Sequence, residues 1–200
     1  NTPPKDRLPV QTTLIKKSGP IIKEAIQREL LRNGQVFYLH NRVETIEEER
    51  ERLEKLLPNV RIAVGHGQMP EDELEEVIKD FVEGKYDILL CTMIVESGID
   101  MPNVNTIIID DAQRFGLADL YQLRGRVGRA DRQAYAYLIV PNALSLDSQA
   151  RQRLRAIMEN TALGSGYQIA MKDLEIRGAG NILGDKQSGH IAAVGFGLYC

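Results

Sequence analysis

The feature that most constrains the fold is a series of short apolar runs, each separated from the next by a stretch with helical periodicity. The apolar runs are 36–40, 60–64, 88–91, 106–109 and 134–140. Residues 88–91 (Ile-Leu-Leu-Cys) are apolar at every position, which is typical of a strand buried on both faces. Strands that alternate with helices of about 10 to 15 residues predict an α/β fold with a largely parallel sheet flanked by helices.

The intervening segments carry helix start and stop signals. Apolar residues recur at helical spacing from Ser18 and stop at Asn33-Gly34. Thr45 and Glu48 form a capping-box pattern that predicts the start of the next helix. Pro70 is expected to open a third helix and Gly84 to close it. Residues 1–14 contain several prolines and read as an extended entry segment.

The last quarter of the chain differs in character. Residues 148–162 are again helical in pattern, and glycines then become frequent. Such glycine density implies repeated turns or close backbone contacts. We therefore expect a main domain over 1–145 and, over 146–200, a helical hairpin and a loop that pack on it.

Composition narrows the functional class. The net charge of −3 argues against a basic nucleic-acid binder, although six glutamates gather in 44–54 and five arginines in 114–132. The two cysteines, Cys91 and Cys200, cannot build a disulfide framework. A reducing, cytoplasmic setting is expected, with no membrane association, because no apolar run reaches about 18 residues. We also expect the chain to be a piece of a longer protein.

Residues 122–129 read Gln-Leu-Arg-Gly-Arg-Val-Gly-Arg. Planar, permanently charged guanidinium groups separated by glycines suit close approach to phosphate oxygens. A surface arginine cluster paired with carboxylates is the alternative. The pattern Q-x-x-G-R-x-G-R resembles the sixth motif of superfamily-two helicases and translocases. That resemblance implies a RecA-like domain, of the P-loop NTPase type, whose arginines reach across a cleft to ATP on a first motor domain.

The chain lacks the phosphate loop G-x-x-x-x-G-K-[ST]. Residues 107–111 (Ile-Ile-Ile-Asp-Asp) imitate a Walker B strand, but strand-end capping or pairing with an arginine is favoured over a magnesium site. ATP with Mg²⁺ would therefore be bound mainly by the missing first motor domain. We expect the isolated chain to have no ATPase activity.

The resemblance also implies roles at the nucleotide. Arg126 and Arg129 match the motif arginines that contact the γ-phosphate, and which of them is the arginine finger stays open. Gln122 would orient the same groups. Gly98 and Asp100 match the fifth motif, next to the nucleotide or the motif arginines, although a tight turn capped by an aspartate is an alternative.

Polar residues follow successive predicted strands and would meet at one edge of a parallel sheet. Hydroxyls, amides and backbone N–H groups at such an edge suit contacts to a DNA backbone. His66 could equally be a loop histidine without a ligand. The candidate DNA contacts are Asn41, Arg42, His66, Gly67, Thr92 and Ser97.

Longer stretches resemble one family within the superfamily, the bacterial transcription-repair coupling factors. They are residues 2–9, 36–43, 65–69, 92–105 and 113–129. The tail motifs D-L-E-I-R-G-A-G and L-G-D-K-Q-S-G resemble the translocation motif that these factors share with the fork-remodelling helicase RecG. The family's coupling residues fall on Arg153, Arg177 and Gln187, with Arg151 and Arg155 as alternatives to the first.

The resemblance implies an ATP-dependent translocase on double-stranded DNA that displaces stalled RNA polymerase and recruits nucleotide-excision repair. Contacts with the polymerase and the repair factor would lie outside these 200 residues. A RecG-type fork-remodelling helicase is the nearest alternative. A stand-alone nucleic-acid-binding module is the non-enzymatic one.

Overall fold

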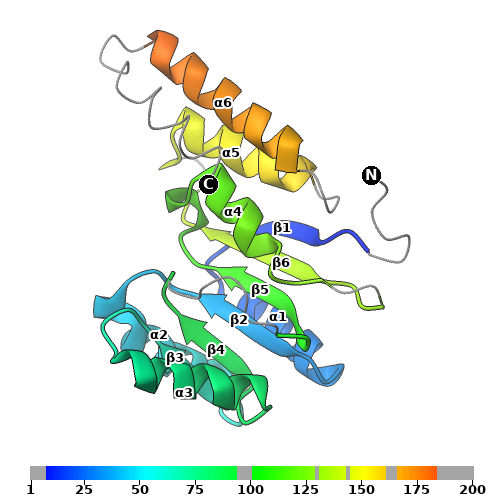
Figure 1. The fold of residues 1–200 in the computed structure, drawn as a ribbon, viewed down its shortest axis with the longest axis vertical. Helices are drawn as coiled ribbons and strands as arrows, with labels where there is room; N and C mark the ends of the chain where they lie inside the picture. Colours follow the sequence, from blue (N-terminus) through cyan, green and yellow to red (C-terminus); the bar gives the residue numbers. More distant parts are fainter. Residues whose placement is uncertain (1–7, 94–100, 129–130, 143–144, 161–165, 184–200) are drawn as a thin grey trace.

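Six strands form one parallel sheet in the computed structural model, which describes residues 8–93, 101–128, 131–142, 145–160 and 166–183. Every strand pair is parallel, so all the carboxyl ends lie at one edge. The strand order is β1-β6-β5-β2-β4-β3 (Figure 1). The strands are β1 (Gln11–Lys16), β2 (Gln35–Leu39), β3 (Ile62–Gly65), β4 (Ile88–Cys91), β5 (Val104–Ile109) and β6 (Tyr135–Val140).

Helices cover both faces of the sheet (Figure 1). The α-helices are α1 (Gly19–Leu31), α2 (Ile46–Leu56), α3 (Glu71–Val82), α4 (Leu117–Arg124), α5 (Ser148–Glu159) and α6 (Gly166–Leu183). Two short 3₁₀ turns are η1 (Val43–Thr45) and η2 (Ala112–Arg114). Helices α1 and α2 pack on one face; α3 and α4 pack on the other, where α5 and α6 stack on α4.

Side chains of the central strands alternate between two cores. In β2, Val36 and Tyr38 pack with α1 and α2, whereas Phe37 and Leu39 pack with the helices of the other face. All residues of β2, β4 and β5 are buried. The predicted α/β fold with a largely parallel sheet is therefore confirmed, and its central strands are buried on both faces as expected.

The strand β1 lies within and just beyond the segment interpreted as an extended entry. It pairs with β6 from Gln11↔Tyr135 to Lys16↔Val140. Each of its residues is exposed or half-buried, because β1 is the edge strand of the sheet that the structure describes. The sequence Gln-Thr-Thr-Leu-Ile-Lys is too polar to have predicted a buried strand.

The helix boundaries agree with most of the start and stop signals predicted from the sequence. Helix α3 follows Pro70 and is closed by Gly84, whose φ of +86° favours glycine. The capping box is wrong, because the Thr45 side chain makes no hydrogen bond to the first turn of α2. Its hydroxyl lies 2.7 Å from His40 Nε2 instead.

The glycine-rich tail is more helical than the sequence suggests. Helix α6 continues through Gly178, where the glycine count predicted turns. Helices α5 and α6 contact each other and together pack on α4, as a helical hairpin would. The proposed loop falls after residue 183, outside the described residues. No helix in the described parts of the chain is both long and apolar enough to cross a lipid bilayer.

The chain leaves the sheet in opposite directions after two neighbouring strands. After β2 it continues to α2 on one face, and after β5 it continues through η2 to α4 on the other face. A crevice therefore opens between the carboxyl ends of β2 and β5. Parallel α/β sheets usually bind their ligands at such a topological switch point.

Candidate functional site

A cavity of about 300 Å³ lies at this switch point. Its walls come from the two diverging connections and from the end of β4. They are formed by His40, Asn41, Arg42, Met93, Asp110, Asp111, Arg114, Phe115 and Asp119. The cavity therefore unites two of the predicted DNA contacts, Asn41 and Arg42, with acidic and basic residues from the β5–α4 connection.

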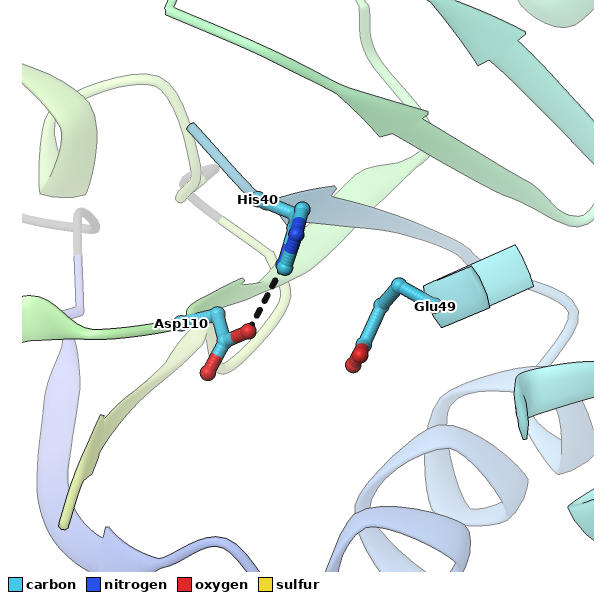
Figure 2. Close-up of side chains that lie close together, drawn as sticks. All are labelled: His40, Glu49 and Asp110. Carbon is cyan, nitrogen blue, oxygen red and sulfur yellow. Dashed lines mark hydrogen bonds and ion pairs between the residues drawn. The ribbon is translucent and has the colours of Figure 1, made fainter. Parts of the chain in front are cut away.

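A buried polar network forms the floor of this cavity. His40 Nδ1 lies 2.7 Å from Asp110 Oδ2, linking the carboxyl ends of β2 and β5 (Figure 2). Because an ionised carboxylate only accepts hydrogen bonds, Nδ1 carries the proton. In the neutral ring, Nε2 then accepts from the Thr45 hydroxyl at 2.7 Å. The imidazole thus fixes the backbone just before Asn41.

Lys17 completes the network from the end of β1. Its Nζ donates to Asp110 Oδ2 at 2.8 Å and to Glu49 Oε1 at 3.0 Å. Burial raises the pKa of Asp110, but the hydrogen bonds from His40 and Lys17 outweigh it, and the pKa lies below its usual value. Burial, reinforced by the Glu49 charge, raises the pKa of the Tyr38 phenol, which donates to Glu49.

His40, Glu49 and Asp110 are buried residues of the types that bind metals, and their ligand atoms lie within 4.8 Å of one another (Figure 2). The Lys17 ammonium already stands between the two carboxylates. A cation is therefore supplied by the protein itself, and the set does not fit a Mg²⁺ site. The sequence favoured strand-end capping or pairing with an arginine over a magnesium site. Asp110 Oδ1 does accept from the Asp111 backbone N–H at the end of β5, but among the described residues its charged partner is Lys17 and no arginine, and its other side-chain partner is His40.

Asp111, the next residue, adopts a left-handed conformation with φ of 52°. Its backbone N–H donates to Asp110 Oδ1, and its own carboxylate accepts from Gln113 Nε2 at 3.3 Å. A non-glycine residue at positive φ stores local strain, which is common at ligand sites. The turn directs the chain from β5 into η2 and on to Arg114, which is exposed at the rim of the cavity.

Two predicted DNA contacts lie side by side at the ends of β2 and β4. The Asn41 side chain is exposed, and its Oδ1 accepts from the Met93 backbone N–H at 3.0 Å. Thr92 is 4% exposed, and its hydroxyl has no hydrogen-bond partner. An unsatisfied buried hydroxyl is costly, so it is a candidate for a ligand contact.

His66 and Gly67 follow β3, at the far end of the same sheet edge. His66 Nδ1 accepts from the Gln68 backbone N–H at 3.2 Å, and the His66 N–H donates to the Met69 sulfur. The ring therefore stabilises its own turn. These contacts correspond to the loop-histidine alternative, and neither residue lines the switch-point cavity.

The arginine motif begins on α4. Gln122, in the last turn of α4, is exposed, and Arg126, two residues beyond the helix, is half-buried. Arg124 differs from both: it is 4% exposed, donates from Nη1 to the Ile157 carbonyl at 2.6 Å, and lies over the Tyr121 ring. Burial lowers its pKa. Arg124 thus joins α4 to α5.

Gly128 ends the described part of the motif with φ of +113°, a conformation that side chains with a Cβ rarely adopt. The glycine is therefore needed for backbone geometry, since an added Cβ would meet its nearest neighbours only at 3.7 and 3.8 Å, an ordinary contact distance. Several predicted site residues lie outside the residues that the structure describes. They are Gly98, Asp100, Ser97, Arg129 and Gln187.

The two described coupling candidates both reach the connection between β5 and α4. Arg153 on α5 donates from Nη2 to the Gln113 carbonyl at 3.0 Å, and its buried Nε has no partner. Arg177 on α6 pairs with Asp173 at 3.3 Å and lies beside Gly116, the residue that precedes α4. The hairpin is thereby attached to the segment that lines the cavity and leads into the arginine motif.

Sequence reasoning missed Lys17 and Arg124 as functional neighbours. No sequence motif marked Lys17, because its role depends on the pairing of β1 with β6 at the sheet edge. Arg124 stood within the arginine motif, and its position on the same helical face as Leu117, Leu120 and Leu123 could have indicated burial.

Comparisons with known proteins agree with this architecture. The chain is 56% identical, over 198 residues, to the transcription-repair-coupling factor of Staphylococcus epidermidis and 57% identical to that of Staphylococcus aureus. Each alignment covers 99% of this chain and 17% of the relative, so the chain spans about a sixth of the length of the curated relatives it matches.

Solved structures with the same fold include DNA-bound RecG and the C-terminal domain of a second protein. The structure of RecG bound to a three-way DNA junction superposes with a TM-score of 0.73 and 37% identity, over 86% of this chain and 22% of RecG. The C-terminal domain of yeast Dbp5, bound to Gle1 and IP6, has a TM-score of 0.57 at 22% identity, over 76% of this chain and 84% of the Dbp5 chain, and so supports the fold alone.

The expected RecA-like architecture and the resemblance to transcription-repair coupling factors are therefore confirmed. The sequence model of the helicase conserved C-terminal domain matches residues 20–131, which run from α1 through the arginine motif and include the switch-point cavity. With more than half of its 200 residues matched in this way, the chain belongs to the helicase C-terminal domain family.

Proposed function

We propose that this chain is the second motor domain of an ATP-dependent translocase on double-stranded DNA, of the transcription-repair coupling type. The whole protein would displace stalled RNA polymerase and recruit a nucleotide-excision repair factor. The identity of 56–57% to such factors over almost the whole chain supports this assignment. The polymerase and repair contacts would lie in the five-sixths of the relatives that this chain does not span.

The arginine motif would form the second wall of an ATP site. Phosphoryl transfer spreads negative charge over the equatorial oxygens, and a fixed guanidinium stabilises that charge. Arg126 or Arg129 would supply it, and Gln122 would orient the same groups. Gln122 in the last turn of α4 and Arg126 just beyond the helix fit this role, because the backbone around them is fixed by Arg124 and Gly128.

Mg²⁺ and most contacts to ATP would come from a first motor domain. Among the described residues, the acidic set at the switch point holds Lys17 instead of offering free carboxylates. Gly98 and Asp100 are proposed to lie next to the nucleotide. The isolated chain is accordingly expected to bind ATP weakly and not to hydrolyse it.

The carboxyl edge of the sheet would bind the DNA backbone. Asn41, Arg42 and Thr92 gather at the ends of β2 and β4 and offer amide, guanidinium and hydroxyl groups. Ser97, His66 and Gly67 are proposed to extend the same path. Such contacts carry no sequence information, which suits a motor that moves along any duplex.

One observation carries the motor assignment: helix α4, which leads into the arginine motif, is joined at both ends to the α5–α6 hairpin. Arg177 lies beside Gly116 at the start of α4, and Arg124 at its end is bonded to α5. Arg153 contacts Gln113 in the preceding turn. A change at the nucleotide could therefore move the hairpin, and Arg153, Arg177 and Gln187 are proposed to transmit it.

The alternative is a RecG-type fork-remodelling helicase, favoured by the superposition on RecG. The two functions are separated by comparing polymerase displacement from a stalled elongation complex with unwinding of a model replication fork, both with the full-length protein and ATP. Displacement without fork unwinding is expected. Unwinding without displacement would establish the RecG-type function. If the protein showed neither activity, a stand-alone binding module would be the remaining function.

A further inference from the structure

Helix α6 presents apolar side chains on the side that faces away from the domain. Tyr167, Met171 and Leu174 are 74%, 48% and 42% exposed. The opposite side of the helix is also occupied, since Ile169 and Ile176 are each 2% exposed and pack into the core. A helix that is apolar on two opposite sides is expected to have neighbours on both.

The neighbouring helix α5 makes the contrast clear. Its exposed residues are all polar: Ser148, Gln149, Arg151, Gln152, Arg155 and Glu159. Both helices belong to the same hairpin and pack on the same domain. The apolar surface on α6 is therefore specific to this helix and is not a general property of the hairpin.

The spacing of the exposed residues identifies the kind of partner. The exposed residues Tyr167, Met171 and Leu174 and the half-buried Gly178 are separated by four, three and four residues, which is the heptad spacing of a helix that packs along another helix. A Cβ placed on Gly178 would meet no atom within 4 Å. The end of this stripe is thus open to close approach of a partner backbone.

The charges beside the stripe pair with each other. Lys172 Nζ lies 3.8 Å from Glu175 Oε1, one helical turn away. The stripe therefore has no excess positive charge to attract nucleic acid, and its complement is apolar.

The exposed area favours a partner in the same polypeptide. The three side chains offer apolar surface on the order of 350 Å², short of the roughly 800 Å² per partner that stable complexes of separate proteins bury. A tethered partner needs less contact, because tethering supplies a high effective concentration. The relatives are about six times as long as this chain, so most of their sequence is available to supply it.

We infer that the stripe formed by Tyr167, Met171, Leu174 and Gly178 docks an amphipathic helix from a part of the full-length protein outside these 200 residues. The inference concerns packing within the polypeptide, and it holds or fails independently of the proposed motor function. The docked helix would cover α6, which the hairpin joins to α4 and the arginine motif.

The test is photo-crosslinking in the full-length protein. Tyr167 is replaced by p-benzoylphenylalanine, which its exposed position accommodates, and the same residue at Gln152 on the polar side of α5 is the matched control. After illumination, mass spectrometry identifies the attached peptide. We expect an intramolecular crosslink from position 167 to a helical peptide outside residues 1–200, and at most a weak one from position 152.

A second variant links the crosslink to the stripe. Met171→Glu combined with Leu174→Glu alters only exposed side chains and should lower the yield from position 167 by about tenfold, because carboxylates resist burial in an apolar contact. A crosslink to a second copy, to another protein, to DNA or within residues 1–200 would overturn the inference. Equal yields at positions 167 and 152 would do the same.

Discussion

Arg124 Nη1 donates to the Ile157 carbonyl at 2.6 Å, and this bond joins the helix of the arginine motif to the last turn of α5. Carbonyls in the last turn of a helix have no partner within it and attract cations. The guanidinium is nearly fully buried, and burial lowers its pKa. A charge is thus held in the interior by a helix end and the Tyr121 ring.

Arg124→Met should lower the free energy of unfolding by about 1–2 kcal/mol, because the buried Ile157 carbonyl loses its donor while the cost of burying the charge disappears. Arg155→Met, on the exposed side of α5, is the control and should change stability by less than about 0.5 kcal/mol. Urea unfolding measures both. Equal stability of the two variants would mean that methionine packing fully replaces the charge.

Lys17→Met should lower stability by about 2–3 kcal/mol at pH 7, because it leaves the buried carboxylates of Asp110 and Glu49 without their ammonium partner. Lys16→Met is the matched control, since Lys16 is an exposed neighbour at the end of β1. Chemical unfolding at several pH values measures the difference.

The pH dependence has a definite sign. The pKa of Asp110 is lower in the folded protein than in the unfolded chain. Its ionised form therefore contributes stability above the unfolded pKa near 4, and this contribution is lost as the pH falls through the lower folded value. The difference between wild type and Lys17→Met should shrink below about pH 4. A constant difference down to pH 2 would contradict the assignment of Lys17 as partner of Asp110.

The fold could largely be predicted from the sequence, because β2, β4 and β5 are buried on both faces and so are continuously apolar. The edge strand β1 could not be predicted, since each of its residues is exposed or half-buried and the polar and apolar residues are mixed. The Thr45 capping box failed for a different reason: the hydroxyl found a closer partner in His40, which only the fold brings near.

The location of the candidate site, at the carboxyl edge of the sheet, could be predicted from the sequence. The individual contacts between its side chains were harder to predict. Parallel strands bring Asn41 and Thr92 together whatever their neighbours are, and the structure does so. Which arginine of the motif is buried between helices depends on which side of α4 faces α5. The motif pattern contains no such information. Pairing of Asp110 with Lys17 likewise joins two residues that are 93 positions apart and that follow β5 and β1, strands that the fold brings together on either side of β6.

Gly128→Ala should distort the arginine motif, because φ of +113° is strained for any residue with a Cβ. We expect a stability loss of about 1–3 kcal/mol and a drop in the ATPase rate of the full-length protein of tenfold or more. Gly125→Ala is the matched control, since Gly125 has φ of −67° and its added Cβ would come no closer than 3.4 Å to its neighbours. Similar losses in both variants would show that space, not backbone conformation, requires these glycines.

Thr92→Val should have opposite effects on stability and binding. The hydroxyl is buried without a partner, so its removal should stabilise the fold by about 1 kcal/mol. If the hydroxyl contacts a DNA phosphate, duplex affinity should fall several-fold in a filter-binding assay at fixed salt. Thr106→Val is the control of opposite sign, because the Thr106 hydroxyl donates to buried Glu29 and its loss should destabilise. Unchanged DNA affinity in Thr92→Val would remove Thr92 from the interface.

Arg153→Gln should uncouple ATP hydrolysis from movement in the full-length protein. Arg153 holds the Gln113 carbonyl in the turn that leads from the cavity to α4, while its buried Nε has no partner. Such a residue can take a second partner when the turn moves, and its loss should reduce coupling by about 1–2 kcal/mol. We therefore expect DNA-stimulated ATPase activity within about twofold of wild type, with translocation slowed about tenfold.

Arg155→Gln distinguishes this role from the general charge of α5, because Arg155 lies on the same helix and is exposed. A triplex-displacement assay for translocation and a phosphate-release assay for ATPase activity should be run on both variants with the same duplex. Both activities should stay within about twofold of wild type in Arg155→Gln. Parallel loss of ATPase and translocation in Arg153→Gln would instead mean that Arg153 supports the arginine motif structurally, and equal uncoupling in both variants would place the coupling arginine elsewhere on α5.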